Sequence, residues 1–273
     1  MRNLIASDLR RVVKDKLLMV VIIVAAAFAV LTPLLYWVLF KGMDAMTVEM
    51  LGVGTYAKDL FFTAFNIGND LGLVAPVLIA VILFKDFSHG TIRNKIIAGK
   101  SRTHIFVSTY VTCLIVLFAV TLFYALLTLG VSLLMFPYQE APFDWACLGY
   151  TLGSLLLELN LYLFVAALVS YICVSSRNIG LVLVKYLGIS MGVAFVTSAL
   201  QIAVMAVEVE GNETALKILE FVQNINIYNY VMVIGKGTSY GTKELLFMIF
   251  TPLVLTAGIF FLGVNKIRKK DIN

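Results

Sequence analysis

Long apolar stretches alternate with short polar ones along this chain, and their lengths are the first guide to its structure. A helix needs about 20 mainly apolar residues to cross the hydrocarbon core of a bilayer. Six stretches reach that length, at residues 17–40, 60–84, 105–134, 146–174, 179–207 and 244–264. The pattern therefore predicts an all-α integral membrane protein with six transmembrane helices. Little chain is left over, so we expect residues 1–273 to form a single transmembrane domain.

Two segments outside these stretches also have helical patterns. Residues 1–16 place apolar side chains at helical spacing beside basic ones, which is typical of an amphipathic helix on a membrane surface. A simple cytoplasmic extension of the first span would have the same pattern. The segment 208–243 is centred on TALKILEFVQNINIYNYVMVIG, which is too apolar for a solvated loop. We expect one or two short helices there, lying on the outer membrane face or re-entering it, with their backbone hydrogen bonds made within the protein.

The composition supports a membrane protein and the charges orient it. Hydrophobic residues make up 61% of the chain and charged residues only 14%, with a mean hydropathy of +0.96, whereas a soluble domain has about 25% charged residues. The net charge is +5. Of the 21 Lys and Arg residues, fifteen lie before span one, between spans two and three, between spans four and five, or after span six. Because basic loops stay in the cytoplasm, this distribution predicts that both termini lie inside, and it argues against a nucleic-acid partner.

One motif suggests a nucleotide site but lacks its requirements. Gly99-Lys100-Ser101 is the second half of a phosphate-binding loop, but Asn94 stands where the first glycine is needed. A membrane span follows, where the motif requires a soluble helix. We therefore expect no nucleotide to bind this chain.

A second motif suggests a serine nucleophile. The run Gly188-Ile189-Ser190-Met191-Gly192 has the G-x-S-x-G pattern, but it lies inside an apolar stretch and not at a strand-to-helix turn. Ser190 lies 13 residues beyond Arg177, which is about 20 Å along a helix. The two histidines of the chain, His89 and His104, are in the loop before span three. Small residues of this kind in a membrane helix more often permit close helix packing.

The stretch FKDFSHGTIRNKIIAGKSRTH, after span two, predicts a short capped helix. Ser88 or Thr91 would cap its start, Gly99 would end it in the left-handed conformation, and Ser101 or Thr103 would cap the next span. We expect an apolar face of Ile92, Ile96 and Ile97, with Arg93, Asn94 and Lys95 facing elsewhere. Such a helix suits a groove on a cytoplasmic partner, and it equally suits lipid headgroups.

Polar side chains inside the spans are costly and suggest function. Those in the outer half are Asn66, Asp70, Glu158 and Asn160. Regular helices would place Asp70 and Glu158 about 22–28 Å from the cytoplasmic ends of their spans. These residues could line a translocation path or gate, or they could cap and pair with neighbouring helices. Lys185 lies near the cytoplasmic end of span five, so we expect it to extend toward the interface and not to Glu158.

The run Asp86-Phe-Ser-His-Gly90-Thr91-Ile92-Arg93-Asn94-Lys95, followed by Ser101-Arg102, resembles the region between spans two and three of ABC-type-2 transporter permeases. Members of that family often carry an acid four residues before G-T-[IL]-[KR], and then S-R. The layout is similar over the whole chain, whereas the residue-level match covers about twenty positions. Two departures affect the details: Asp86 stands where glutamate is commoner, and Thr109 stands where many members carry lysine.

The resemblance implies that this loop is a coupling helix, which docks on a separate cytoplasmic ABC ATPase. The docking residues that it implies are Asp86, Gly90, Thr91, Ile92, Arg93, Asn94 and Lys95. Two permease chains, identical or different, would combine with two ATPases into an exporter of the bacterial plasma membrane. The chain would bind no cofactor and have no catalytic residue, because ATP and Mg would lie on the ATPase.

Two other classes of function stay open at this point. An intramembrane enzyme would use Ser190 or the buried acids, and would hydrolyse a substrate in the absence of any ATPase. A channel or secondary transporter would use Asp70 and Glu158, and would carry ions across liposomes without an ATPase.

Overall fold

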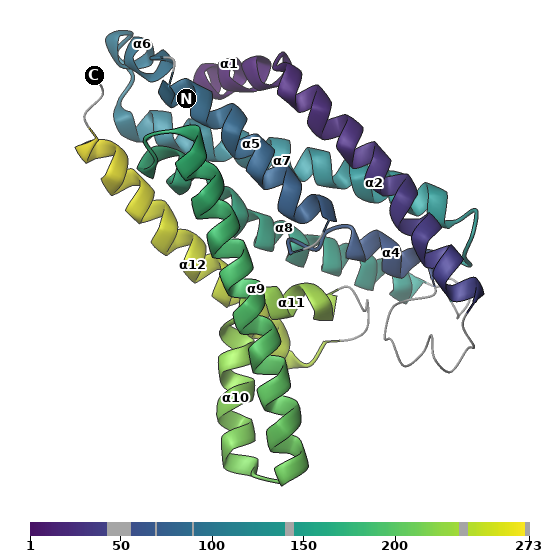
Figure 1. Cartoon of the computed structure of the whole chain (residues 1–273). Coiled ribbons are helices and arrows are strands. Elements are labelled where there is room, and N and C mark those ends of the chain that lie inside the picture. Colours follow the sequence, from purple (N-terminus) through teal and green to yellow (C-terminus); the bar gives the residue numbers. More distant parts are fainter. Residues whose placement is uncertain (43–55, 69, 89, 140–144, 235–239, 271–273) are drawn as a thin grey trace.

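The computed structural model describes residues 1–42, 56–68, 70–88, 90–139, 145–234 and 240–270. In this part of the chain every regular element is an α-helix (Figure 1). The helices are α1 Arg2–Val13, α2 Lys16–Lys41, α4 Ala57–Thr63, α5 Asp70–Ser88, α6 Thr91–Ile97, α7 Arg102–Ser132, α8 Trp145–Ser175, α9 Ile179–Glu210, α10 Glu213–Ile225, α11 Ile227–Ile234 and α12 Thr242–Lys269. Among these described helices, α2, α5, α7, α8, α9 and α12 are long and apolar enough to cross a membrane. In these residues the predicted class is confirmed as an all-α protein with six helices long and apolar enough to cross a membrane.

Span two differs from its predicted extent, 60–84, because the structure divides that stretch into α4 and α5. The chain turns between them at Asn66, whose Oδ1 accepts a hydrogen bond from Gly68 N at 2.8 Å. Gly72, in the first turn of α5, lies so close to the backbone of Asn66 that a side chain would collide with it. The break is therefore built from one side-chain hydrogen bond and one close backbone approach. It falls on the polar run Asn66-Ile67-Gly68-Asn69-Asp70, which is short compared with the apolar residues on either side.

Helix α8 is at the centre of the molecule and packs against α5, α7, α9, α11 and α12. Helices α5 and α7 also pack on each other, and α2 packs against both. By contrast, α9 and α12 bury few of their apolar side chains within the chain. Such exposed apolar surface is suited to contact with lipid.

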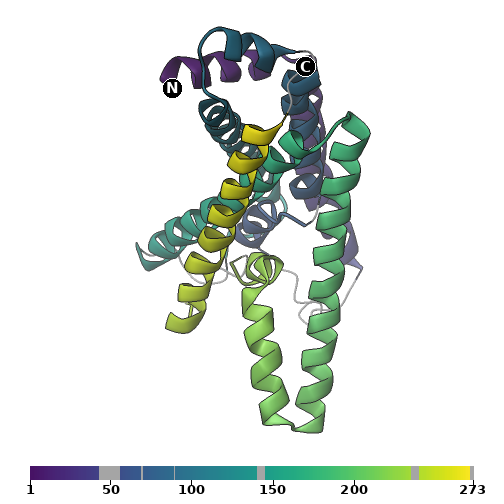
Figure 2. The same ribbon diagram turned by 90° about the vertical axis from the view of Figure 1, so that its left-hand side faces the viewer.

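The two ends of the molecule differ. Both chain termini lie at the end that carries α1 and α6 (Figure 1). Toward the opposite end, α10 folds back along α9, and this hairpin extends beyond the other helices (Figures 1 and 2). Helix α9 has 32 residues, a length of about 48 Å, whereas the hydrocarbon core is about 30 Å thick. Its last turns therefore exceed what a crossing needs.

Candidate functional site

Helix α6 is the short helix between α5 and α7, and glycines set both of its ends. Gly90 precedes it with a φ of +69°, and the structure shows no side-chain cap there. The prediction of a cap by Ser88 or Thr91 is therefore wrong: Ser88 Oγ donates to Lys85 O at 3.2 Å, and Thr91 is the first helical residue. Glycine adopts this left-handed conformation without the steric cost that a Cβ adds.

The C-terminal end of α6 agrees with the prediction. Gly99 has a φ of +78° and its N–H donates to Ile96 O at 2.9 Å, while Lys100 N donates to Lys95 O at 3.1 Å. This pair of bonds is the Schellman arrangement. Ser101 then caps α7, because its Oγ accepts from His104 N at 3.2 Å. The ends of α6 thus hold the helix at a defined angle to both spans.

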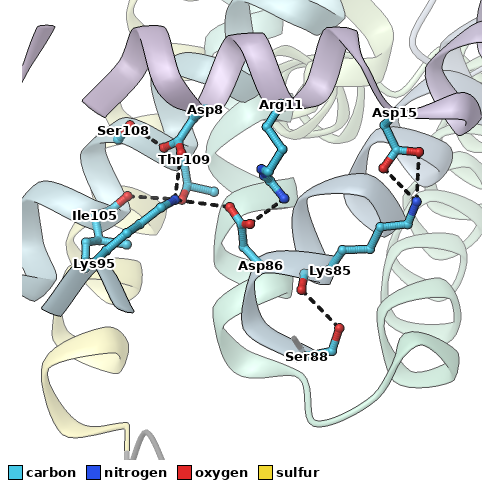
Figure 3. Close-up of polar contacts among 10 residues, drawn as sticks. All are labelled: Asp8, Arg11, Asp15, Lys85, Asp86, Ser88, Lys95, Ile105, Ser108 and Thr109. Atoms are coloured by element: carbon cyan, nitrogen blue, oxygen red, sulfur yellow. Dashed lines mark hydrogen bonds and ion pairs between the residues drawn. The ribbon is translucent and has the colours of Figure 1, made fainter. Parts of the chain in front are cut away.

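Lys95 fastens α6 to the rest of the molecule (Figure 3). Its Nζ lies 2.7 Å from Asp8 Oδ1 on α1 and 3.2 Å from Asp86 Oδ2 on α5. Arg11, one turn after Asp8, forms an ion pair with the other oxygen of Asp86. Ser108 on α7 donates to Asp8 Oδ2 at 2.6 Å. One lysine thereby joins four helices through buried carboxylates.

A second ion pair lies beside the first group (Figure 3). Lys85 Nζ is 2.6 Å and 2.8 Å from the two carboxylate oxygens of Asp15, which also caps α2 by accepting from Leu17 N at 2.9 Å. Burial opposes ionisation of Asp15, but these hydrogen bonds and the positive charges of Lys85 and Arg11 outweigh it, so the pKa of Asp15 is lowered. We call the six charged residues Asp8, Arg11, Asp15, Lys85, Asp86 and Lys95 the ion network. Its three positive and three negative charges balance.

The faces of α6 differ from the prediction. Ile92 is buried and Ile96 is partly buried, but the Ile97 residue is 75% exposed. Successive residues of a helix are about 100° apart, so Ile97 cannot share the narrow inward face of so short a helix. Lys95, expected to face away, points inward into the ion network. The exposed face of α6 is Arg93, Asn94 and Ile97.

The S-R pair after α6 has two structural tasks. Ser101 caps α7, and Arg102 Nη1 donates to Arg268 O at 2.8 Å and to Lys270 O at 2.9 Å at the end of α12. Lys270 Nζ in turn donates to Val174 O at 2.8 Å at the end of α8. The first turn of α7 and the ends of α8 and α12 are thus held together by hydrogen bonds beside α6.

The four polar residues predicted for a path or gate do not form one site. Asn66 is used in the turn between α4 and α5. Asn160 Nδ2 donates to Met248 O at 3.1 Å and to Ile249 O at 3.0 Å on α12. Pro252 lies inside α12 and has no N–H, so it leaves the carbonyl four residues earlier, that of Met248, without its helical partner. Asn160 supplies the missing donor.

The structure describes the side chain of only one of the two acidic residues predicted for a path or gate. The side chain of Asp70 lies outside the described part of the chain. Glu158 is completely buried, and neither of its carboxylate oxygens has a hydrogen-bond partner among the described residues. Lys185 extends to the end of α8, where its Nζ donates to Ser175 O at 3.1 Å, as predicted. It therefore does not compensate Glu158.

A known family matches most of the chain. The sequence model of a family described as a protein of unknown function, DUF2705, matches residues 70–273. The chain belongs to the DUF2705 family. No curated protein matches it. The match begins where α5 begins, so Asp86, Lys95 and Glu158 of this DUF2705 chain lie inside the matched region, and α1 lies before it.

Ser190, the serine of the G-x-S-x-G motif, is buried in this DUF2705 protein. Ser190 borders a cavity of about 200 Å³ between α8, α9 and α11, whose lining includes Tyr186 and Tyr228 but no histidine, aspartate, glutamate or lysine. His104 is at the start of α7, where its Nδ1 is 2.8 Å from Ser101 Oγ, and His89 lies outside the described residues. No cluster of metal-ligating side chains occurs in the described part of the chain.

Sequence reasoning missed the α1 half of the ion network. The prediction for residues 1–16 rests only on their apolar and basic positions. It therefore gives no role to Asp8 or Asp15 and no partner to Arg11. One signal was available: Asp8 and Asp15 are the acids of an otherwise basic segment, and seven residues, about two helical turns, separate them. Asp8 lies in α1 and Asp15 precedes α2, and each carboxylate pairs with a lysine from the α5–α6 region.

Proposed function

We propose that this chain is the transmembrane permease subunit of an ABC-type exporter, and that it docks a separate cytoplasmic ATPase through the loop 85–104. One observation carries the proposal. Helix α6 is bonded inward through Lys95 and Ile92, while Arg93, Asn94 and Ile97 remain exposed beyond the spans. Because this segment resembles the coupling helix of ABC-type-2 permeases, we infer that the exposed face binds a cytoplasmic ABC ATPase.

The chemistry of the exposed face supports a protein partner. Ile97 is a large apolar side chain at a polar end of the molecule, next to Arg93 and Asn94. An apolar anchor with a cationic neighbour fits a hydrophobic pocket with an acidic rim, the usual anatomy of a binding hot spot. Asp86 and Lys95 support docking from within, because they fix the angle of α6 and do not touch the partner.

The ion network provides a route for mechanical coupling. A force on α6 acts on α1 through Asp8, on α5 through Asp86 and on α7 through Ser108, which bonds to Asp8. Closure of the two ATPases around ATP and Mg would displace α6, provided that the ATPases contact it differently in their open and closed states. This chain itself then needs no cofactor and performs no hydrolysis.

The arrangement in the cell follows from the proposal. The end with α1, α6 and both termini faces the cytoplasm, and the α9–α10 hairpin faces the outside of a bacterial plasma membrane. Two such permease chains and two ATPases form the exporter, with the cargo path between the permeases. The apolar spans suit an amphipathic cargo.

The docking test is co-purification of the chain with an ABC ATPase of the same cell, sought first among the genes next to its own. Arg93→Glu and Ile97→Asp should each lower the amount of bound ATPase at least about tenfold, equivalent to about 1.4 kcal/mol. Lys217→Glu and Ile218→Asp on α10 make the same chemical changes at the opposite end and should leave binding unchanged. Full ATPase recovery with the Arg93 and Ile97 variants combined would refute docking at this face.

A further inference from the structure

Glu158 is the most unusual ionisable group in the described part of the molecule. It lies in the middle of α8, is 0% exposed, and neither Oε1 nor Oε2 has a hydrogen-bond partner there. An unpaired carboxylate buried in an apolar interior costs several kcal/mol, and proteins avoid that cost by binding a proton or a cation. Glu158 must therefore differ chemically from the six charged residues of the ion network, which compensate one another.

The side chains around Glu158 bring hydroxyl groups and no counter-charge. Ser154 and Tyr162 lie one helical turn before and after it, on the same face of α8. Tyr162 and Tyr240 are near enough to interact with a charge on Glu158. Other elements bring further titratable groups close to Tyr162 and its neighbours: Tyr124 on α7 and Tyr186 on α9. Among the described residues these groups are all neutral tyrosines.

The basic side chain of α9 is engaged elsewhere. Lys185 donates to the oxygens of Ser175 at the far end of α8. Ser175 lies 17 residues beyond Glu158, about 26 Å along the helix. No lysine or arginine of the described chain forms an ion pair with Glu158.

A chain of hydroxyls connects this region to a cavity. Ser154 Oγ and Tyr240 Oη are 2.8 Å apart, and Tyr240 Oη donates to Ile234 O at 3.3 Å. Tyr240 also lines an open cavity of about 600 Å³ between α8 and α12, together with Asn160 and with Leu157, the residue next to Glu158. Since Tyr240 gives its proton to the Ile234 carbonyl, Ser154 is the donor to Tyr240. The lone pairs of Ser154 Oγ then remain free to accept a proton from Glu158, which lies one turn farther along α8.

We propose that Glu158 is a proton-binding site, which holds a proton at neutral pH and exchanges it with the α8–α12 cavity through Ser154 and Tyr240. In the release step the carboxyl O–H bond breaks and Ser154 accepts the proton while passing its own to Tyr240. Tyr240 turns its O–H away from the Ile234 carbonyl and passes its proton to water in the cavity, and a negative charge stays on Glu158. Because the carboxyl does not touch Ser154 in this structure, a side-chain rotation or a water molecule must close the gap. A buried Glu158 carboxylate without a partner is unfavourable in free energy. Proton release should therefore accompany opening of the α8–α12 contact, which admits water.

This proposal is independent of the proposed ATPase partner, and the purified chain alone tests it. Infrared spectra of the full-length protein in lipid nanodiscs report a protonated carboxyl group by its carbonyl stretch, which shifts in D₂O. We expect that band in the wild type at neutral pH, its loss in Glu158→Gln and in Glu158→Met, and its retention in Glu213→Gln, which changes an exposed glutamate of α10. Tyr240→Phe should slow the D₂O shift of the band several-fold, because the hydroxyl relay is interrupted.

The opposite results would overturn the proposal. An unchanged band in both Glu158 variants would assign the proton to another carboxyl group. Absence of the band in the wild type until sodium is removed would make Glu158 a metal-cation site, and an equally fast shift in Tyr240→Phe would exclude the hydroxyl route. Two variants are used so that misfolding of one does not decide the result. Glu158→Gln keeps the shape of the side chain, and Glu158→Met places an apolar side chain in the apolar interior.

Discussion

Lys95 is the residue on which the position of α6 depends most. It is almost enclosed between two carboxylates, each of which is itself buried. A buried charge that loses its partner is far more costly than an exposed one, because water cannot replace the lost contact. Arg93, two residues earlier on the same helix, is exposed and offers a direct comparison.

Lys95→Met should therefore destabilise the folded chain by about 3–5 kcal/mol, measured as a lowered free energy of unfolding in detergent. Arg93→Met should change it by no more than about 0.5 kcal/mol. Removing the stranded acid as well, in Lys95→Met with Asp8→Asn, should recover part of the loss. Equal stability of the Lys95 and Arg93 variants would contradict the ion network.

Asn160 donates to the Met248 carbonyl, which Pro252 leaves without a helical partner, and also to the Ile249 carbonyl. Asn160→Leu should cost about 1 kcal/mol, because the Met248 carbonyl that Pro252 leaves free loses its donor. In a Pro252→Ala background the helix itself can supply that donor, so the cost of Asn160→Leu should fall toward zero. A double-mutant cycle of unfolding free energies measures this coupling. Additive effects of the two substitutions would show that Asn160 serves another purpose.

At the scale of elements, Gly99 decides how α6 ends. An added Cβ would meet nothing within 4 Å, so the cost of Gly99→Ala comes from the backbone alone. Its φ of +78° should make that cost about 1–2 kcal/mol. Gly188→Ala in α9 also meets nothing within 4 Å, but it lies in a regular helix and should stabilise by up to about 1 kcal/mol. Thermal unfolding of the two variants would show shifts of opposite sign.

The ion pair between Asp15, at the start of α2, and Lys85 on α5 should be sensitive to acid. The pKa of Asp15 is lowered in the folded state, so its contribution is fully present above its unfolded pKa of about 3.9. The contribution is lost as the pH falls through the lower folded pKa. Comparing wild type with Asp15→Asn should therefore show a stability difference at neutral pH that disappears in strong acid. A difference that stays constant with pH would show that the charge of Asp15 is not its source, because asparagine caps a helix as well as aspartate does.

At the scale of the whole molecule, the two ends should be reached from opposite sides of the membrane. After Cys113, Cys147 and Cys173 are replaced by alanine, Glu213→Cys on α10 should react with an impermeant maleimide added to intact cells. Arg93→Cys on α6 should react only after the membrane is permeabilised. Labelling of both positions from the same side would contradict the proposed orientation.

The spans could be predicted from the sequence because hydropathy is a sum over neighbouring residues, and a membrane helix is long enough for that sum to be decisive. The division of 60–84 into α4 and α5 was missed because the same sum hides a local signal. The run Asn66-Ile67-Gly68-Asn69-Asp70 favours a turn, but the apolar residues on both sides outweigh it. The end of α6 at Gly99 and the cap of α7 by Ser101 are local and were predicted. The face of Lys95 was not, because its partner Asp8 is 87 positions away.

The sequence by itself thus determined the class of protein, the six spans and the uneven distribution of charge, since each depends on residues close together in the chain. The tertiary structure alone decided that Lys95 faces inward and Ile97 outward, that Asn160 replaces a donor missing at Pro252, and that Glu158 has no partner in the described chain. These are questions of which side chains meet. Their answers depend on how helices far apart in sequence pack, and hydropathy does not record that information.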